Sequence, residues 1–527
     1  MLTNLGEAGS ASHMRSRAMK PGTGRSPRAC HGFVTDDARP DGGERKAARS
    51  ESGLRRRSLL KAAASLGPAV TLPGLLGCRG GSFSTDPSVP NVIFITADDL
   101  GWNDLGCYGN PNLGTPHIDR LAREGARFTH AFGVTSSCAP SRASFITGEY
   151  PHTHGVTGLA HIHLLRSLSP FRETLPSLLA EAGFNTALEG KWHVAPYLPA
   201  SLYGYRERLS GLLAEAMVIQ GSTRTLDFIR RNRNNRFYLE INYMNNHRDA
   251  RGEFHFADGF PVDPEGVQIP PYLQLPDWPE IRLELARFYS QTRKMDAMVG
   301  DVLTLLDELE LAETTLVLFV SDNGPPFPGS KMTLYDRGIG SPLLLRWPAR
   351  IPPGLVVDDL VTTLDLLPTV LEAAGLEVPE GVQGRSLLGR VTGTEEGPVR
   401  EAVFSEMTDH VEYIPTRAVR TRSWKYIRNF SDIAIGLDQL RDMEWVHRLC
   451  ELPDQPWKRP RLPEELYDLE ADPNEQRNLA ASPDHREVLQ SMAARLDRHM
   501  AETGDPYLGA PFTRDHDPAV YEPDPSR

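Results

Sequence analysis

The amino-acid sequence predicts an α/β protein in which helices sandwich a mixed β-sheet, followed by a smaller C-terminal α+β domain. Short, fully apolar runs at 91–95 and 316–320 have the composition of buried strands, and segments with helical periodicity lie between such runs. From about residue 400 the pattern changes to short strand-like runs and a closing helix at 485–500. The alternating part predicts the layered sheet, and the later part predicts the smaller domain.

Local signals place the individual elements. Thr115-Pro116 starts a helix, because proline suits the first helical turn, and Gly183 and Gly375 end two more. A long apolar period predicts a helix at 281–309 that is broken near Gly300. We expect strands at 91–95, 236–243, 316–320 and 343–345, helices from 116 and at 175–182, 281–309 and 364–374, then strands at 403–404, 416–419 and 424–427 and a helix at 485–500.

Composition and charge divide the chain further. It has 527 residues, 40% hydrophobic and 24% charged, which excludes disorder throughout. Residues 1–78 carry 13 basic and 6 acidic residues, a net charge of +7, whereas the remainder has a net charge of −19. An acidic body lacks the basic surface that neutralises phosphates, so we expect no nucleic-acid partner. The predicted parts are a leader at 1–78, a linker at 79–89, a main domain at 90–395, a C-terminal α+β subdomain at 396–510 and a tail at 511–527.

The basic leader has the organisation of an export signal. Arg56-Arg57 precedes an apolar stretch at 62–76 that is too short and too interrupted by Gly and Pro to be a good membrane span. The arginine pair resembles a bacterial twin-arginine signal, and Leu75-Leu76-Gly77-Cys78 resembles a lipoprotein cleavage box. We expect an exported bacterial protein, periplasmic or at the cell surface, attached to the membrane only through a lipid anchor at Cys78. The alternative is a plain cleaved signal in which Cys78 has no role.

Acidic side chains follow two of the predicted strands. Asp98-Asp99 comes after the strand at 91–95, and Asp322-Asn323 comes after the strand at 316–320. Ligand sites in open α/β sheets lie at the carboxyl ends of strands, and carboxylate and amide oxygens suit Ca²⁺ or Mg²⁺. Each pair alone is more often a turn or a helix cap. Together they predict a divalent metal site.

A longer motif lies between these two pairs. Cys138-Ala139-Pro140-Ser141-Arg142 is followed by Ala143-Ser144 and Thr147-Gly148. This pattern resembles the sulfatase family, in which the cysteine is oxidised to formylglycine. Other motifs of the family fall in order along 90–510: Asp98-Asp99, Gly190-Lys191-Trp192-His193, His247, Asp322-Asn323-Gly324, Lys331 and Glu465-Leu466-Tyr467-Asp468. The resemblance implies an alkaline-phosphatase-like sulfatase fold and a hydrolase of sulfuric esters or sulfamates.

The resemblance also implies a role for each matched residue. The metal, expected to be Ca²⁺ with Mg²⁺ as the other candidate, would be held by Asp98, Asp99, Asp322, Asn323 and the modified Cys138. Arg142 and Lys191 would stabilise the hydrated formylglycine, and His193 would be the base that releases sulfate. Lys191, His247 and Lys331 would contact the sulfate, with His247 protonating the leaving group. A formylglycine-generating enzyme is implied as a maturation partner.

Several segments narrow the resemblance to the sulfamidase branch, which cleaves the N-sulfate of a terminal glucosamine. They include 322–328, 191–194 and 156–159, whereas Lys331 stands where that branch has arginine. Glu406 and His410 are candidates for contacts with the sugar. Residues 79–527 have a net charge of −19, which would repel a long polysulfated chain. This repulsion favours exo-action on short heparin or heparan fragments. Three alternatives stay open: an O-sulfatase, a phosphonate or phosphodiester hydrolase, and a non-catalytic surface protein that binds sulfated glycans.

Overall fold

The computed structural model describes residues 88–160, 167–210, 223–249, 251–410, 412–433, 440, 443–453 and 461–513. The predicted leader and most of the predicted linker lie outside these residues, as does Cys78. No helix in the described segments combines the length and the apolar character that crossing a membrane requires.

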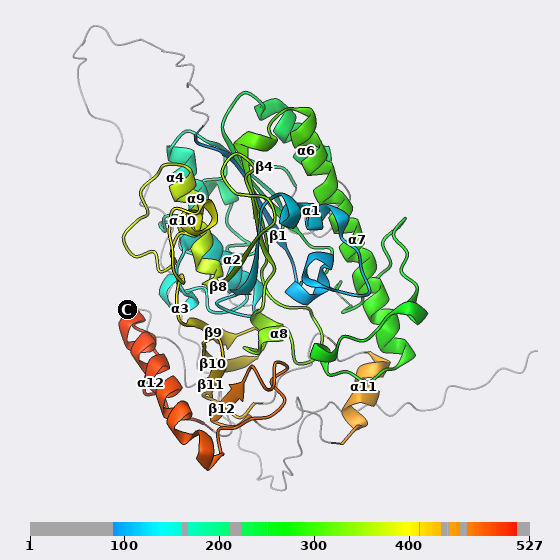
Figure 1. Cartoon of the computed structure of the whole chain (residues 1–527), viewed down its shortest axis with the longest axis vertical. Coiled ribbons are helices and arrows are strands. Elements are labelled where there is room, and N and C mark those ends of the chain that lie inside the picture. The colour runs from blue at the N-terminus through cyan, green and yellow to red at the C-terminus, as the bar shows by residue number, and fades with distance from the viewer. Residues whose placement is uncertain are drawn as a thin grey trace, which may run out of the picture. The chain divides into compact units, whose positions relative to one another are not determined.

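The main sheet has eight strands, in the order β4-β3-β5-β1-β6-β7-β2-β8 (Figure 1). All neighbours run parallel except β7, which is antiparallel to both β6 and β2, so the sheet is mixed, as the sequence predicts. β1 and β6 pair along their whole length at its centre. The strands are β1 (Asn91–Ala97), β2 (Ala126–Phe132), β3 (Asn185–Gly190), β4 (Glu207–Arg208), β5 (Phe237–Tyr243), β6 (Thr315–Ser321), β7 (Leu343–Arg346) and β8 (Leu355–Thr362).

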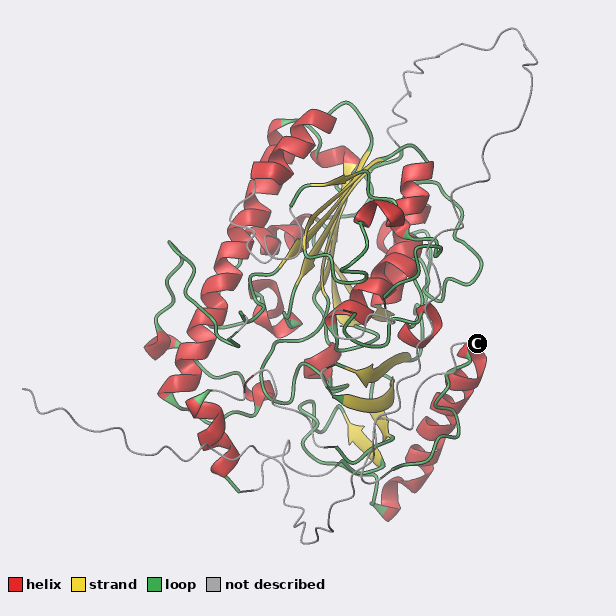
Figure 2. Ribbon diagram, turned by 180° about the vertical axis from the view of Figure 1, so that it is seen from behind, coloured by secondary structure: helices red, strands yellow, loops and turns green. Residues whose placement is uncertain are grey.

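Helices cover both faces of this sheet (Figure 2). Val92 and Phe94 of β1 belong to the core on one face, and Ile93 and Ile95 to the core on the other, because side chains alternate along a strand. The first face packs against α2 (Cys138–Thr147), α4 (Leu175–Glu181), α9 (Leu366–Ala373) and α10 (Leu388–Thr392), and the second against α1 (Pro116–Glu124), α6 (Thr223–Asn232) and α7 (Pro279–Glu308). The short helices are α3 (Pro151–His154), α8 (Asp336–Ile339) and α11 (Glu444–Glu451).

One predicted feature of α7 is wrong. The helix continues without a break from Pro279 to Glu308, through Gly300. The glycine is explained by packing, since a Cβ atom at this position would lie 2.6 Å from Cγ of His117 on α1. Gly300 therefore lets α1 and α7 approach each other closely, and it does not end the helix.

The C-terminal part forms the expected smaller antiparallel sheet. Its order is β12-β11-β10-β9, and α12 (Arg486–Thr503) packs on one of its faces. The opposite face packs against Met332, Leu334 and Ile339 of the main body, so the two sheets are joined by an apolar core. The predicted boundary between residues 395 and 396 stays a prediction. The strands are β9 (Val403–Asp409), β10 (Tyr413–Arg420), β11 (Trp424–Asn429) and β12 (Glu464–Asp468).

Gly300→Ala should test the close approach of α1 and α7. In an unobstructed helix this change stabilises by about 0.5–1 kcal/mol, whereas overpacking against His117 should destabilise by about 2 kcal/mol. Urea unfolding measures the sign. Adding His117→Ala should remove the obstruction and restore part of the loss. A stabilised Gly300→Ala variant would show that a Cβ atom fits between α1 and α7.

Candidate active site

The two acidic pairs meet at one edge of the sheet. β1 and β6 are adjacent and parallel, with Ala97 opposite Ser321, so the residues that follow leave the sheet side by side. The backbone N–H of Asp99 donates to Oδ1 of Asp322 at 3.1 Å, and Nδ2 of Asn323 donates to Oδ1 of Asp99 at 2.7 Å. Asp99 has a φ of 61°, a left-handed conformation that is uncommon for aspartate and concentrates at functional sites.

Cys138 lies against this acidic edge. It is the first residue of α2, which is buried along its whole length, and its side chain is 1% exposed. The thiol approaches Oδ1 of Asp99 at 3.8 Å, and one ligand atom each from Asp98, Asp99, Cys138 and Asp322 lies within 4.8 Å of the others. Burial raises the pKa of the Cys138 thiol, which keeps it protonated and makes it a poor nucleophile in the unmodified state.

Three buried cations face the three carboxylates. Nζ of Lys191 lies 2.7 Å from Oδ2 of Asp98, and Nζ of Lys331 lies 2.8 Å from Oδ2 of Asp99. Arg142 comes one helical turn after Cys138, and its Nε donates to Oδ2 of Asp322 at 2.8 Å. The cluster therefore has three negative and three positive charges in an environment where an unpaired charge is costly.

The charges of the cluster shift the pKa values of Asp98 and Asp322 in opposite directions. Burial alone would raise the pKa of Asp98, but Lys191, with His247 and Arg142, holds it well below its usual range. Burial and the neighbouring Asp98 raise the pKa of Asp322 to about 7 despite its contact with Arg142. The crowding of carboxylates is thus only partly relieved by the lysines and the arginine.

The oxygen atoms at this edge suit a divalent cation. Oδ1 of Asp98 and Oδ1 of Asn323 are buried, and among the described residues neither has a hydrogen-bond partner. Buried polar atoms are normally satisfied, so a pair of orphaned oxygens indicates a missing partner. Hard carboxylate and amide oxygens are ligands for Ca²⁺ or Mg²⁺, and the residues present therefore fit the predicted metal.

The two histidines predicted for the site differ in position. His247 offers a ring nitrogen within the same 4.8 Å group as Asp98 and Cys138, and its Nδ1 donates to the carbonyl of Arg248 at 2.6 Å. Burial and the Lys191 ammonium lower the pKa of His247. His193 is half-buried two residues after Lys191, and it belongs to none of the described groups of potential metal ligands.

The two predicted sugar contacts also separate. His410, in the turn after β9, lies 2.9 Å from Oγ of Ser137, the residue before Cys138, so it borders the cluster of carboxylates and cations. Glu406 instead binds His152: its Oε1 accepts the His152 backbone N–H at 2.8 Å, and its Oε2 contacts Nδ1 of the same ring. The carboxylate of Glu406 is therefore engaged within a second buried cluster, together with Asp505.

Comparison with known proteins identifies the family. The sequence model of the family described as Sulfatase matches residues 90–376, and the model described as N-sulphoglucosamine sulphohydrolase, C-terminal, matches residues 330–445. The chain belongs to the sulfatase family. It is accordingly a hydrolase of sulfuric esters or sulfamates.

The relatives of this sulfatase are named for different substrates. Human N-sulphoglucosamine sulphohydrolase is 31% identical over 80% of this chain and 92% of its own length. An ulvan-active sulfatase of Formosa agariphila is also 31% identical, over 79% of this chain and 81% of its own. Among solved structures, the phosphonate monoester hydrolase of Silicibacter pomeroyi shares the fold, with a TM-score of 0.63 and 19% identity over 81% of this chain and all of that one.

Three residues of the sulfatase that support the site were missed by sequence reasoning. Arg248 fixes the ring of His247 through its carbonyl, and its guanidinium is held by Glu284 at 2.7 Å. Ser137 joins His410 to the start of α2, and His152 holds Glu406. Arg248 and Ser137 adjoin the predicted residues His247 and Cys138, so adjacency was the signal that could have found them. No local signal links His152 to Glu406, 254 positions away.

The second cluster predicts a pH-dependent contribution to stability. Burial alone would lower the pKa of His152, but Glu406 raises it above its ordinary value of 6.5. A raised histidine pKa gives stability that is complete below 6.5 and is lost as the pH rises through the folded value. At about pH 5.5, Glu406→Gln should lower the free energy of unfolding by about 3 kcal/mol, because the buried His152 loses the carboxylate that stabilises its charged form. In urea unfolding, this loss should shrink as the pH rises.

Glu401→Gln is the matched control, since Glu401 is exposed and its ion pair with Arg495 lies in solvent. It should change stability little at any pH. A loss in Glu406→Gln that is the same from pH 5.5 to about pH 9 would contradict an ion pair that titrates with His152.

Proposed function

We propose that this sulfatase uses a formylglycine at position 138 and a divalent metal, expected to be Ca²⁺, to remove the N-sulfate from the terminal glucosamine of heparin or heparan fragments. The observation that carries the proposal is the buried cluster of three carboxylates and three cations around Cys138. The similarity of residues 330–445 to the C-terminal part of N-sulphoglucosamine sulphohydrolase supports the substrate.

Asp98, Asp99, Asp322 and Asn323 would hold the metal, with the modified side chain of residue 138 beside it. The metal and the modified side chain would together supply a nucleophile and a route for release of sulfate that an ordinary serine lacks. A formylglycine-generating enzyme is the implied maturation partner.

The chain's own cations explain why an anion would bind here. Without a metal, the three carboxylates balance Arg142, Lys191 and Lys331, so a divalent cation would make the cluster doubly positive. Such a site attracts a sulfate group, and preorganised cations stabilise the charge that moves onto its oxygens during transfer. Arg142 and Lys191 would act on the groups at position 138, and Lys191 and Lys331 would contact sulfate.

Two histidines would move protons. An amine is a poor leaving group unless it is protonated, and His247 lies next to Asp98 and Cys138 with its Nδ1 engaged by a carbonyl, which leaves Nε2 to serve the substrate. His193 would act as the base for release of sulfate. His410, beside Ser137, would contact the sugar, whereas the proposed contact of Glu406 would require it to exchange His152 for a hydroxyl.

The setting of the enzyme is part of the proposal. The acidic body favours exo-action on short fragments. The predicted export, with a lipid anchor at Cys78 and no other membrane contact, rests on the sequence alone. O-sulfatase activity is the second candidate, because Lys331 departs from the sulfamidase pattern and an ulvan-active sulfatase is as similar in sequence as the human relative.

Cys138→Ala should lower kcat/KM by at least about 10³-fold, because the nucleophile is lost. In the active enzyme, the tryptic peptide with position 138 should weigh about 18 Da less than its thiol form. Cys107→Ala is the control, since Cys107 is a half-buried free cysteine outside the cluster and should leave activity unchanged. An active enzyme whose peptide has the thiol mass would refute formylglycine, and an inactive thiol protein would favour the non-catalytic alternative.

Ca²⁺ added to chelator-treated protein should raise the midpoint of thermal unfolding, because a ligand of the folded state stabilises it. The double variant Asp98→Asn with Asp322→Asn should lose this response. Asp227→Asn with Asp307→Asn removes two exposed carboxylates and should keep it. A parallel titration with Mg²⁺ compares the ions. A response to Ca²⁺ that survives in the first double variant would place the metal elsewhere.

His247→Gln should lower kcat/KM for glucosamine N-sulfate by about 10²–10⁴-fold, the contribution expected of a general acid. With an aryl sulfate the loss should be under about 10-fold, because a phenolate leaves without a proton. Equal losses on both substrates would show that His247 only binds sulfate.

Two measurements on the wild type test the substrate. Rates on aryl sulfates or phosphonate esters above those on glucosamine N-sulfate would favour the alternative activities, and cleavage inside intact heparin would exclude exo-action.

A further inference from the structure

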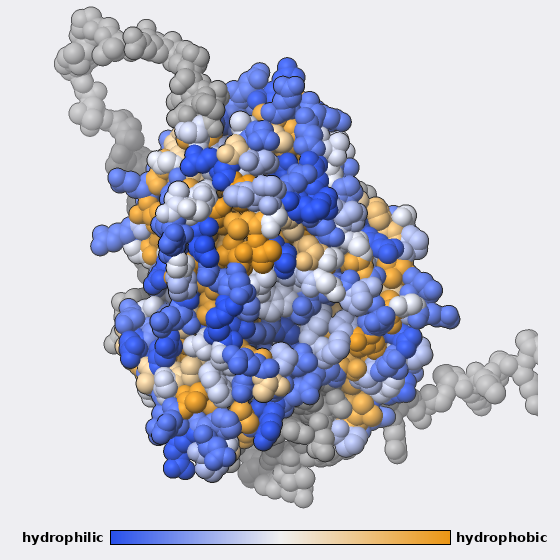
Figure 3. Space-filling model, viewed as in Figure 1, coloured by the Kyte–Doolittle hydropathy of each residue, from blue (hydrophilic) through white to orange (hydrophobic). Residues whose placement is uncertain are grey.

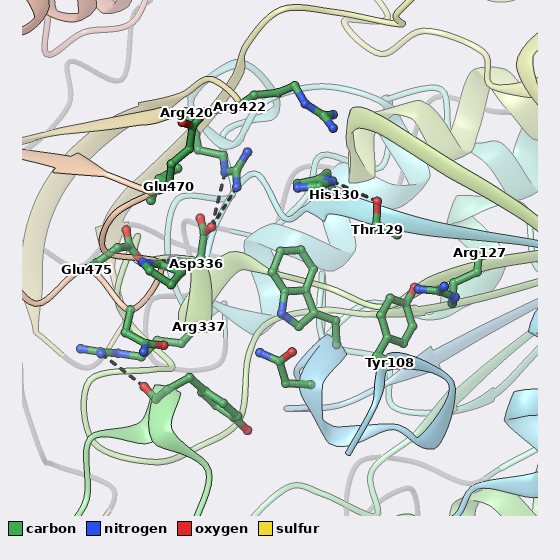
Figure 4. Close-up of a pocket in the computed structure, with 16 residues that line it drawn as sticks. Tyr108, Arg127, Thr129, His130, Asp336, Arg337, Arg420, Arg422, Glu470 and Glu475 are labelled. Atoms are coloured by element: carbon green, nitrogen blue, oxygen red, sulfur yellow. Dashed lines mark hydrogen bonds and ion pairs between the residues drawn. The ribbon is translucent and has the colours of Figure 1, made fainter. Parts of the chain in front are cut away.

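A separate cavity of about 610 Å³ lies between the main body and the small sheet. That volume is within the usual range for sites of small molecules. Figure 4 shows Arg127 beside Tyr108 at one end and Arg337 and Arg420 near the other. The space-filling view in Figure 3 shows a hollow on this side of the molecule that is bordered mainly by hydrophilic residues. We call this cavity the arginine cleft.

Positive charge in the arginine cleft is only partly compensated. Among the described residues, no carboxylate lies within 4.0 Å of Arg127 or Arg337, although both line the cleft. Within the described part of the chain, the guanidinium of Arg337 donates to the carbonyls of Gly329 and Tyr272. Neither guanidinium has a carboxylate in direct contact, although the nearby Glu475 acts on Arg337, so both can form charge-assisted hydrogen bonds to an anion.

Two of the three acidic side chains that line the cleft, Asp336 and Glu475, are paired with cations, whereas the exposed Glu470 accepts a hydrogen bond from Ser423. Asp336 binds Arg420 at 3.2 Å and also Lys425, and Lys425 binds Glu475 at 2.9 Å from behind the lining. Arg422 pairs with Asp358, but both side chains are more than half exposed, and such surface pairs contribute little and exchange readily. An anion entering the cleft would therefore find Arg127, Arg337 and Arg422 available.

Aromatic rings complete the lining. Trp102, Tyr108 and Tyr272 line the same cleft as the arginines, and the guanidinium of Arg127 lies 5.3 Å from the centre of the Tyr108 ring. Aromatic faces stack on flat apolar surfaces, such as the C–H face of a sugar ring, while arginine binds sulfate or carboxylate with two parallel hydrogen bonds. This combination fits a sugar with anionic substituents better than it fits an apolar molecule.

The arginine cleft is distinct from the catalytic cluster. None of Asp98, Asp99, Cys138, Asp322 or Lys331 lines it. Arg420 and Arg422 lie at and beyond the end of β10, opposite the turn that carries His410. Eight residues of strand span about 25 Å, so an anion in the cleft would lie far from the sugar contact proposed for His410.

We propose that the arginine cleft is a second, non-catalytic binding site for a sulfated saccharide of one or two residues. Arg127, Arg337 and Arg422 bind the sulfate groups, and Trp102 packs on a sugar ring. The proposal does not depend on the reaction at Cys138, because the cleft would bind sulfated sugars that the enzyme does not cleave.

Calorimetric titration of the full-length mature enzyme tests the proposal. The probe is an O-sulfated disaccharide with an N-acetylated amino sugar, which has no N-sulfate to be removed. Arg127→Gln with Arg422→Gln should weaken its binding at least about 10-fold, the loss expected when charge-assisted hydrogen bonds are removed. Arg230→Gln with Arg231→Gln removes the same charge from exposed positions on α6 and should bind as the wild type does.

The other arms identify the ligand and separate the two sites. The desulfated disaccharide and inorganic sulfate should each bind more weakly than the probe. The Arg127→Gln, Arg422→Gln variant should keep its activity on an aryl sulfate, which shows that it is folded whatever the natural substrate is. Equal affinity of variant and wild type, or no binding to the wild type, would overturn the proposal. If inorganic sulfate binds as tightly as the probe, the ligand of the cleft is a simple oxyanion and not a saccharide.

Discussion

Burial of three carboxylates at the ends of β1 and β6 is the constraint on which this molecule depends. An uncompensated carboxylate in such an interior would neutralise itself or unfold the site, so each one has a dedicated cation from a different part of the fold. Arg142 comes from α2, Lys191 from the end of β3 and Lys331 from the loop after β6. The electrostatics therefore tie three distant segments to one edge of the sheet.

The parallel register of β1 and β6 makes this arrangement possible. Ala97 and Ser321 are opposite each other, so both acidic pairs begin at the same level, and α2 presents Cys138 and Arg142 from the same helical face. The convergence of the two acidic pairs could be predicted from sequence, because apolar strands with polar ends are local patterns. The alternation of strands and helices predicted the mixed sheet for the same reason. Cys138 and Arg142 were predicted from the resemblance of their motif to the sulfatase family.

What could not be predicted depends on contacts between remote residues. In the sequence, Gly300 is compatible both with a helix end and with close packing against a neighbouring ring. Only the position of His117 in the folded protein distinguishes the two. The sequence made Glu406 a candidate for a sugar contact, but its partner His152 is contributed by α3 of the main body. The arginine cleft likewise gathers residues from both sheets, and no sequence segment contains enough of them to suggest a site.

The depth of Cys138 has a consequence for the order of events during biosynthesis. The side chain is 1% exposed, and the whole of α2 is enclosed by the packed interior. An enzyme that oxidises this cysteine needs the surrounding segment in its own active site, which the folded chain does not permit. Under the proposed function, conversion to formylglycine would have to precede the packing of α2 against the sheet, so the rate of folding would set a time limit for maturation.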